Sequence, residues 1–407
     1  MPSFVSNLES AIDGTVLSAD KIQTLHKDRP LWVRYDLDKI KRSLQIDNLK
    51  NRPHNIWRYK ELLPLSPEDS VISLGEVVTP IISCEKLGKK YGLDKLYIKD
   101  ESSLPTGSFK SRGLVMAVNM AKKFGVKTVA IPTAGNAGGA MAAYAARAGM
   151  DAYVFMPEDT PLINKFECKV FGAKAFLING LIGDCGKIVR DGKDNIGWFD
   201  MSTLKEPYRI EGKKTMGLEL AEQFNWRSPD VILYPTGGGT GLIGMWKAFN
   251  ELDQLGWLKD GKRPRMVAVQ SDGCCPIVRA FDAGERFAEP VENPYTIASG
   301  IRVPSAIGDF MILDAVRESG GKAIAVPEEK IIDYMELTAK TEGISICPET
   351  AACVVALEML SNEGWLQADE EIVIFNTAAA QKYPDITEIK FTMIDIGSPI
   401  DWDIIRR

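Results

Sequence analysis

The segment Asp100-Glu-Ser-Ser-Leu-Pro-Thr-Gly-Ser-Phe-Lys-Ser-Arg-Gly113 is the most informative part of the chain. It follows the strand-like run Lys95–Ile98 and leads through a Pro/Thr/Gly turn into an amphipathic run that ends at Phe124. We therefore expect Lys110 in the first turn of a helix, where the positive end of the macrodipole disfavours another positive charge. This field and partial burial should lower the pKa of its amine and favour the free base that a Schiff-base lysine needs. The alternative is an ordinary surface lysine.

Short β-rich runs alternate with helical periods over most of the chain. A helix of small residues that ends near Ala148 is expected after Thr128–Ile131, and a helix from about Leu162 to Phe171 is expected after Ala152–Met156. Strands separated by helices of this length favour parallel sheets with crossover connections, and we predict an α/β fold with two sheets flanked by helices. The expected strands after Lys95–Ile98 are Thr128–Ile131, Ala152–Met156, Ala175–Ile178, Val231–Tyr234, Met266–Val269 and Ile372–Phe375.

Size and composition exclude several classes of protein. A chain of 407 residues is too long for one core, while 45% hydrophobic and 26% charged residues are ordinary for a globular protein. The net charge of −6 offers no basic footprint for nucleic acid. No apolar stretch could span a bilayer and the N-terminus lacks a signal-peptide pattern, so we expect no membrane partner. Seven scattered cysteines, an odd number, suggest reduced thiols and a cytoplasmic location.

Histidine is too rare to carry the chemistry. The chain has only His26 and His54, both near the N-terminus, which makes histidine triads and histidine-rich metal sites improbable. If the chain is an enzyme, its proton transfers must use other side chains.

Two loops rich in small residues follow expected strands and could bind anions. In Thr133-Ala-Gly-Asn-Ala-Gly-Gly139 the backbone N–H groups could converge on an anion, and Asn136 adds an amide donor. The alternative is a tight strand-to-helix turn. In Thr236-Gly-Gly-Gly-Thr-Gly241 the bare backbone could approach a phosphate, aided by the Thr240 hydroxyl and by the dipole of the helix expected from Leu242 to Asn250. Alone this glycine run is a weak signal, because it lacks a P-loop lysine.

A third loop, Asn376-Thr-Ala-Ala-Ala-Gln-Lys-Tyr-Pro384, follows the last expected strand. Thr377 offers a neutral hydroxyl there, although such a residue is often only a helix N-cap. A reactive lysine, a nest for a carboxylate, a second nest for a phosphate and a neutral hydroxyl together match what pyridoxal 5′-phosphate requires.

The chain resembles the fold-type II pyridoxal-phosphate enzymes, which have a fold like the tryptophan synthase β chain, and most of all the threonine synthase group. The resemblance is nearly continuous from about residue 55 to 385. The stretch Arg29–Asp36 also resembles the N-terminal extension of some members. Those members carry cysteine pairs there, which this chain lacks, so we expect no zinc. The matching stretches are Trp57-Arg-Tyr-Lys-Glu-Leu-Leu-Pro64, Gly75–Pro80, the lysine loop, Gly135–Gly138, Pro157, Gly172–Ala173, the glycine run, Pro348–Ala351 and Thr377–Pro384.

The resemblance implies a role for each matching residue. Lys110 would hold the cofactor as a Schiff base and move protons at Cα and Cβ, Asn136 would bind the cofactor's phenolic oxygen, and Thr377 would face its ring nitrogen. The cofactor phosphate would be held by Gly237, Gly238, Gly239, Thr240 and Gly241. The residues implied near the substrate are Thr133, Ala134 and Gly135 for its carboxylate and Ser108 and Arg112 for anionic groups, although Arg112 could equally be a solvated helix arginine.

The resemblance also implies a domain organisation. An N-terminal extension would span residues 1–54, a large cofactor-binding domain 55–98 and 210–407, and a smaller mobile domain 99–209. Fold-type II enzymes are commonly dimers, so a homodimer is expected.

Three loops depart from the threonine synthase pattern. Ser111 stands where the family generally has aspartate, the glycine run lacks asparagine and is closer to serine/threonine dehydratases, and alanines follow Thr377 in place of glycines. The first hypothesis is the conversion of O-phospho-L-homoserine and water to L-threonine and phosphate, with Lys165, Arg112 and Arg302 as candidates for the substrate-phosphate pocket. The second is a threonine/serine dehydratase or a related β-elimination or β-replacement enzyme. The third is an inactive relative with a regulatory role, against which the intact Lys110 and glycine run argue.

Overall fold

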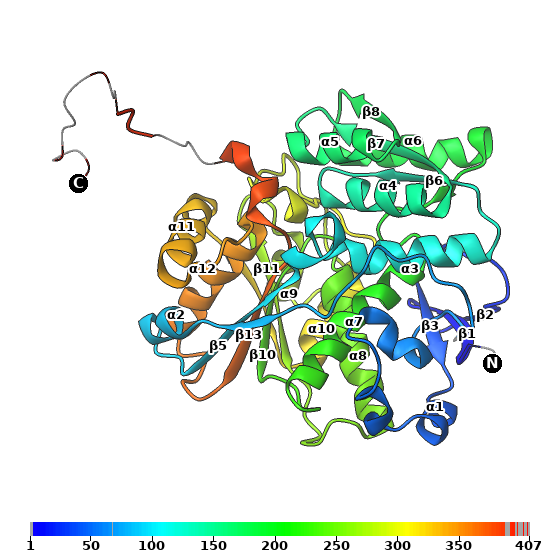
Figure 1. Ribbon diagram of the computed structural model, residues 1–407, viewed down its shortest axis with the longest axis horizontal. Coiled ribbons are helices and arrows are strands. Elements are labelled where there is room, and N and C mark those ends of the chain that lie inside the picture. Colours follow the sequence, from blue (N-terminus) through cyan, green and yellow to red (C-terminus); the bar gives the residue numbers. More distant parts are fainter. Residues whose placement is uncertain are drawn as a thin grey trace.

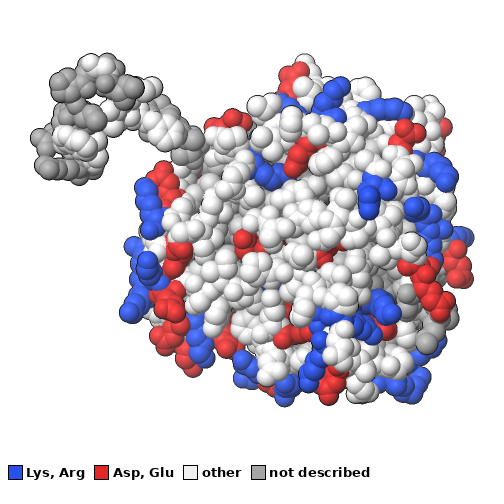
Figure 2. Space-filling model, viewed as in Figure 1, with Lys and Arg blue, Asp and Glu red and all other residues white. Residues whose placement is uncertain are grey.

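A computed structural model describes residues 3–66, 68–386, 391–394, 397, 402 and 405. Its strands form three sheets of three, six and four strands (Figure 1). On the face shown in Figure 2, positively and negatively charged side chains are interspersed around a largely uncharged centre. Within the described ranges, no helix combines the length and apolar character that crossing a membrane requires.

The large sheet has six strands, and its last strand in sequence lies inside it. All neighbouring strands are parallel except the edge pair β4–β5, which is antiparallel. Along β10 the side chains alternate between the two faces, with Ile232 and Tyr234 in one apolar core cluster and Leu233 in the other. The strand order is β12 (Lys322–Val326), β11 (Arg265–Ser271), β10 (Val231–Pro235), β13 (Glu371–Asn376), β5 (Lys95–Asp100) and β4 (Ile81–Ser83).

The small sheet has four parallel strands and lies at the top of the view in Figure 1. Its order is β8 (Lys174–Ile178), β7 (Asp151–Pro157), β6 (Thr128–Pro132) and β9 (Phe199–Asp200).

Helices cover both faces of the two parallel sheets (Figure 1). In the large sheet α2, α11 and α12 contribute to one core cluster, and α7 to α10 contribute to the other. In the small sheet α3, α4 and α5 lie on one side and α6 on the other. The helices are α1 (Leu37–Ser43), α2 (Glu85–Lys90), α3 (Lys110–Lys123), α4 (Asn136–Ala148), α5 (Leu162–Val170), α6 (Ile182–Ile196), α7 (Tyr208–Gln223), α8 (Thr240–Leu255), α9 (Pro276–Asp282), α10 (Asp309–Glu318), α11 (Ile331–Glu342) and α12 (Pro348–Asn362).

The N-terminal residues form a third sheet that the sequence did not reveal. The strands β1 (Val5–Ser10), β2 (Val16–Leu17) and β3 (Leu31–Tyr35) pair in antiparallel fashion. Leu8 and Val33 are fully buried in the same core cluster as the helices of the large sheet. The extension is therefore packed onto the body of the protein through the apolar face of its sheet.

The predicted fold class is confirmed, since both larger sheets consist of parallel strands flanked by helices, apart from the edge strand β4. Every strand predicted from the sequence is present within one or two residues of its expected limits. Two features correct the prediction of two parallel sheets: the antiparallel N-terminal sheet and the antiparallel edge strand β4. The parallel strands β9 and β12 were not predicted. The division of the chain at residues 54, 98 and 209 stays a prediction.

Candidate active site

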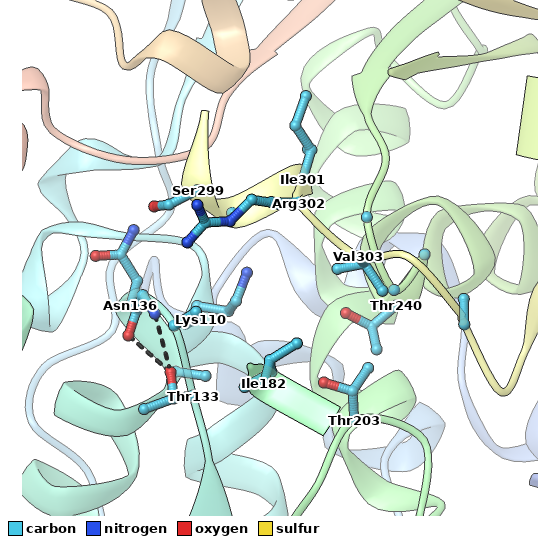
Figure 3. Close-up of a pocket in the computed structure, with 18 of the residues that line it drawn as sticks. Lys110, Thr133, Asn136, Ile182, Thr203, Thr240, Ser299, Ile301, Arg302 and Val303 are labelled. Atoms are coloured by element: carbon cyan, nitrogen blue, oxygen red, sulfur yellow. Dashed lines mark hydrogen bonds between the residues drawn. The ribbon is translucent and has the colours of Figure 1, made fainter. Parts of the chain in front are cut away.

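A cavity of about 340 Å³ opens where the loops of the two parallel sheets meet. Loops at the carboxyl ends of parallel strands share one edge of a sheet, and this is where open α/β folds bind ligands. The loops after β6, β10 and β13 all reach this cavity, together with Lys110 and the segment 299–307 (Figure 3).

Lys110 is the first residue of α3 and reaches into the cavity (Figure 3). It follows a turn in which Thr106 and Gly107 both have positive φ, 58° and 59°. Burial and, next, the positive charge of Arg209 lower the pKa of the Lys110 amine to about 8. The direction expected from the sequence is confirmed, with burial as the first cause.

Backbone hydrogen bonds join the lysine loop to the loop after β13. The N–H of Phe109 donates to the Thr377 carbonyl at 3.0 Å, and the N–H of Ala379 donates to the Gly107 carbonyl at 2.9 Å. These two bonds hold the lysine loop against the loop that carries Thr377.

Thr377 is buried beside a thiol. Its hydroxyl lies 3.5 Å from the Sγ of Cys347, and burial raises the pKa of that thiol to about 12. The thiol is thus neutral at physiological pH, so the Thr377 hydroxyl has a neutral neighbour.

Asn136 begins α4 and is held at the cavity wall by two side-chain bonds. Its Nδ2 donates to the Tyr383 hydroxyl at 3.1 Å, and its Oδ1 accepts from Asn164 at 2.8 Å. The Tyr383 hydroxyl donates to Glu349 at 2.9 Å. In the preceding turn the Thr133 hydroxyl accepts from the N–H of Gly135 at 3.2 Å, which shapes the loop (Figure 3).

The glycine run forms a bare-backbone wall at the start of α8. Gly239 has a φ of +76°, and a Cβ there would lie 2.3 Å from the Ile312 side chain. A Cβ on Gly241 would lie 1.9 Å from the hydroxyl oxygen of Tyr234. Thr240 is the first residue of the helix, so the N–H groups of its first turn face the cavity loop. This combination suits a phosphate group.

Ser108, Arg112 and Lys165 do not line the cavity. Arg112 is fully buried in ion pairs with Glu101 at 2.5 Å and Glu219 at 2.6 Å, so it is neither a solvated arginine nor a cavity residue. The Lys165 amine donates to the Glu158 carbonyl at 2.5 Å. None of the three side chains therefore lies where it could contact a molecule bound in the cavity. Arg302, the other candidate for a phosphate pocket, does line it (Figure 3).

Arg209, which no sequence pattern indicated, lies at the cavity wall. The residue is 1% exposed, and its Nη1 donates to the Met201 carbonyl at 2.9 Å. Its Nε has no partner and no carboxylate forms an ion pair with it within the described ranges. Its spacing from Glu206 resembles a surface i, i+3 pair, so only the burial of α7 distinguishes it.

Glu206 only partly offsets the charge of Arg209. Burial raises the pKa of the Glu206 carboxyl to about 7, against the opposing effect of Arg209. A large fraction of this carboxyl is therefore protonated near neutral pH, and the guanidinium keeps much of its positive field.

The cavity fits pyridoxal 5′-phosphate. Several buried polar atoms at its wall lack a partner among the described residues, as expected where a polar ligand completes the site. The glycine run offers the phosphate cradle, and Lys110 a free amine. The unpartnered atoms are Tyr234 Oη, Ser299 Oγ, Glu349 Oε2 and Arg209 Nε.

Comparisons with known proteins identify the family of the chain. Residues 72–378 match the family described as "Pyridoxal-phosphate dependent enzyme". A threonine synthase of Methanocaldococcus jannaschii is 35% identical over 379 residues, which cover 93% of this chain and 92% of the relative. A threonine synthase of Mycobacterium tuberculosis strain H37Rv is 32% identical over 334 residues, 82% of this chain and 89% of the relative.

Solved structures share the fold at lower identity. Maize serine racemase superposes with a TM-score of 0.65 at 22% identity, covering 74% of this chain and 88% of the racemase. The processed form of threonine deaminase isoform 2 from Solanum lycopersicum gives 0.62 at 20% identity, covering 81% and 92% of the two chains. The chain therefore belongs to the pyridoxal-phosphate dependent enzymes and, within them, to the threonine synthase family.

Proposed function

We propose that this chain converts O-phospho-L-homoserine and water to L-threonine and inorganic phosphate. Two observations support the proposal. The relatives that it matches over most of its length are named threonine synthases. The cavity wall also carries Arg209, a buried cation without an ion pair among the described residues, which a phosphorylated substrate would need and an unphosphorylated amino acid would not.

The residues that would hold the cofactor are those that the loops bring together. Lys110 would bind it covalently, Asn136 would bind its phenolic oxygen, and Thr377 would face its ring nitrogen. The N–H groups of Gly237 to Gly241 would hold its phosphate. When bound, the cofactor withdraws electrons from the α-carbon of the amino-acid substrate.

Lys110 would move the protons of the reaction. With its pKa lowered to about 8, a larger fraction of its amine than of an ordinary lysine is unprotonated near neutral pH and can accept the Cα proton. The same amine would then remove a proton from Cβ as phosphate leaves Cγ. Protons would return to Cγ and Cα, and water would add its hydroxyl to Cβ. Thr133, Ala134 and Gly135 precede α4, where N–H groups would hold the substrate carboxylate.

The environment of Arg209 is the main support for a phosphorylated substrate. A buried guanidinium with an unpartnered Nε and no ion-paired carboxylate among the described residues is costly unless an anion completes it. Thr203 lies beside it, since Nη1 of Arg209 is 3.5 Å from the Thr203 hydroxyl. In Figure 3 the hydroxyls of Thr203 and Thr240 point toward the space that Lys110 enters.

The charge of Arg209 favours an anionic group on the substrate. Lys205 and Arg302 form ion pairs with Asp200 at 3.4 Å and Asp159 at 2.7 Å. Arg209 forms no such pair among the described residues, although the charges of Glu206 and Asp200 act on it. Within the described ranges, the charged side chains at the cavity wall are Lys110, Lys205, Arg209, Arg302 and Glu349.

Substrate comparison tests the proposal directly. Phosphate release from O-phospho-L-homoserine should exceed oxo-acid formation from threonine or serine. Arg209→Gln should raise KM for the phosphorylated substrate roughly 30-fold or more, the effect of about 2 kcal/mol for a charge-assisted hydrogen bond. Arg227→Gln is the matched control, because Arg227 is exposed and pairs with Glu371 away from the cavity. Equal KM values for the two variants would refute the phosphate-binding role.

A threonine/serine dehydratase is the second candidate. The Gly-Gly-Gly-Thr-Gly loop favours it, and one of the proteins that share the fold is a threonine deaminase. Oxo-acid formation from threonine without phosphate release from O-phospho-L-homoserine would establish it.

We also propose a cytoplasmic homodimer. Exposed apolar side chains concentrate on α5 and the edge strand β8, which would bury them in an interface. The cysteines are all unpaired and buried, as expected in a reducing compartment. Sedimentation should give the mass of a dimer, and Phe166→Asp should give a monomer. The exposed residues are Leu162, Phe166, Val170, Phe176 and Leu177.

A further inference from the structure

A second lysine contacts the residue that precedes Lys110. Lys213, on α7, is fully buried, and its amine donates a hydrogen bond to the backbone carbonyl of Phe109. Its Nζ lies 3.8 Å from the centre of the Phe109 ring, and the Nζ of Lys110 lies 4.0 Å from the same centre. Phe109 immediately precedes Lys110, so both amines lie close to the ring of the same residue.

Lys213 differs from the other fully buried lysines in having no carboxylate partner. Lys99 pairs with Glu219 at 3.1 Å, and Lys214 pairs with Glu211 at 2.8 Å. For Lys213 no such pair exists within the described ranges. Burial, followed by the positive charges of Lys110 and Arg209, lowers its pKa well below that of a free lysine. An unprotonated amine avoids the cost of a buried charge and can still donate an N–H.

The helices around Lys213 leave room for its side chain at two glycines. A Cβ on Gly113 of α3 would lie 3.1 Å from the Cε of Lys213. A Cβ on Gly244 of α8 would lie 2.7 Å from the Cβ of Lys213. The side chain is therefore confined between two neighbouring helices on its way to the carbonyl of Phe109.

Both backbone groups of Phe109 are held by distant parts of the chain. Its N–H donates to the Thr377 carbonyl at 3.0 Å, and its carbonyl accepts from Lys213 as well as from the N–H of Arg112 at 3.2 Å. The peptide before Lys110 is thus fixed from the large sheet on one side and from α7 on the other.

We propose that Lys213 is a positioning residue for Lys110. Its uncharged amine holds the carbonyl of Phe109 and so sets the direction in which the Lys110 side chain enters the cavity, without placing a positive charge behind the reactive amine. This inference rests on the proposed role of Lys110 as the group that binds the cofactor and moves protons.

Three substitutions separate the hydrogen bond from the charge. Lys213→Met removes the donor, Lys213→Gln keeps a donor without charge, and Lys213→Arg keeps a donor with a permanent charge. Misplacing a catalytic group by a fraction of an ångström should lower kcat of the holoenzyme for phosphate release on the order of tenfold in Lys213→Met, with KM little changed. Lys213→Gln should recover most of that loss.

The pH dependence of Lys110 reactivity tests the charge state without cofactor or turnover. Reductive methylation of Lys110 by formaldehyde and cyanoborohydride, followed by peptide mass spectrometry of the apoprotein, gives the midpoint of its titration. The midpoint should be unchanged in Lys213→Met and Lys213→Gln and lower in Lys213→Arg, because only arginine adds a charge. The other groups that act on Lys110 stay constant across the series: Arg209, Glu349, Cys347 and Lys382. Those that act on Lys213 besides Lys110 are Arg209, Glu101 and Arg112.

Lys214→Met is the neighbouring control. It leaves Glu211 and Glu251 short of a partner, so it should lower stability while the Lys110 midpoint stays where it is. An unchanged kcat in Lys213→Met, or a Lys213→Gln variant no better than it, would overturn the positioning role. A higher midpoint in Lys213→Met would also overturn the proposal, because it would mean that the native amine is charged.

The midpoint measurements still decide the proposal if Lys213→Met does not fold or if the native protein releases no phosphate. If Lys213→Met does not fold, equal midpoints for Lys213→Gln and Lys213→Arg overturn the proposal and a lower midpoint for arginine supports it. If the native protein releases no phosphate, the proposed function fails, but the apoprotein midpoints still decide the charge state of Lys213.

Discussion

Lys110 enters the cavity with a pKa of about 8, against 10.5 for a free lysine. Between these values the unfolded chain binds a proton at this position that the folded chain does not. The difference in proton binding makes the stability of the apoprotein rise with pH over this interval, compared with a Lys110→Met variant. The destabilising effect of burying the charged amine is fully present below pH 8. It disappears as the pH passes 10.5.

The first prediction concerns the free amine of Lys110. Lys110→Ala should abolish turnover, because it removes the group that binds the cofactor and moves the protons. Lys110→Arg is the matched control, since it keeps the positive charge but cannot supply a free amine. We expect both to be inactive in a phosphate-release assay. Substantial activity in either variant would refute the proton-transfer role.

The second prediction concerns the pH dependence of substrate binding. Burial raises the pKa of Glu206 to about 7, so this carboxyl gains its negative charge beside Arg209 as the pH rises through 7. The affinity for the substrate phosphate should therefore weaken with rising pH more in the native protein than in Glu206→Gln. The ratio of the two KM values between pH 6 and 8 measures this effect. A pH-independent ratio would contradict it.

The positions of site residues were predictable from the sequence where they lie in a characteristic loop after a strand. Lys110, Asn136 and Thr377 follow strands, and the structure gathers them at one cavity. Arg112 could not be placed, because only packing reveals that Glu101 and Glu219 neutralise it. Arg209 was missed for the converse reason, since nothing in the sequence shows that its charge lacks a partner.

At the level of elements, the junction of β10 and α8 depends on the absence of side chains. Gly239 has a positive φ, and Ile312 occupies the place where its Cβ would lie, at 2.3 Å. The backbone of this loop can approach a phosphate closely because its glycines have no side chains and tolerate a positive φ.

The third prediction compares the two ends of α8. Gly239→Ala should weaken cofactor binding roughly tenfold or more, because the positive φ alone costs a residue with a Cβ about 1–2 kcal/mol. Gly256→Ala is the matched control at the C-terminal end, where φ is +69° and only the Lys41 amine is near, at 3.7 Å. Titration with the cofactor, followed by visible absorbance, gives both affinities. Equal losses in the two variants would contradict the cradle.

Elements were predictable where β-rich runs stand between helical periods, as for β5 to β8, β10, β11 and β13. The strand β12 was missed because its alanines at 323 and 325 carry little β preference. The N-terminal strands were missed because polar residues such as Asn7 and Glu9 alternate with few apolar ones. Pairing with β3 provides the stability that the sequence of β1 alone does not show.

For the whole molecule, the N-terminal sheet is bound to the body by a buried cluster of charges. The Tyr35 hydroxyl donates to Glu211 at 2.7 Å, and Glu211 also pairs with Lys214 and Lys247 at 2.8 Å and 2.6 Å. Glu251 completes the cluster. The extension therefore contributes an apolar face and a polar contact to the same core.

The fourth prediction tests this contact. Tyr35→Phe should lower the free energy of unfolding by about 1–3 kcal/mol, the range for a buried hydrogen bond to a charged group. Tyr295→Phe removes a hydroxyl from a side chain that is 61% exposed and should have little effect. Urea denaturation of the two variants gives the comparison. Equal stabilities would mean that the extension is held by its apolar face alone.

The position of β13 has a consequence for how the protein is made. This strand is the last of the large sheet in sequence, yet it lies between β10 and β5 and leads directly to Thr377, which binds the peptide before Lys110. A chain emerging from the ribosome therefore cannot complete this sheet before β13 has been translated. The reactive amine acquires its final surroundings only then, so no half-made chain can capture the vitamin B6 coenzyme in a working site.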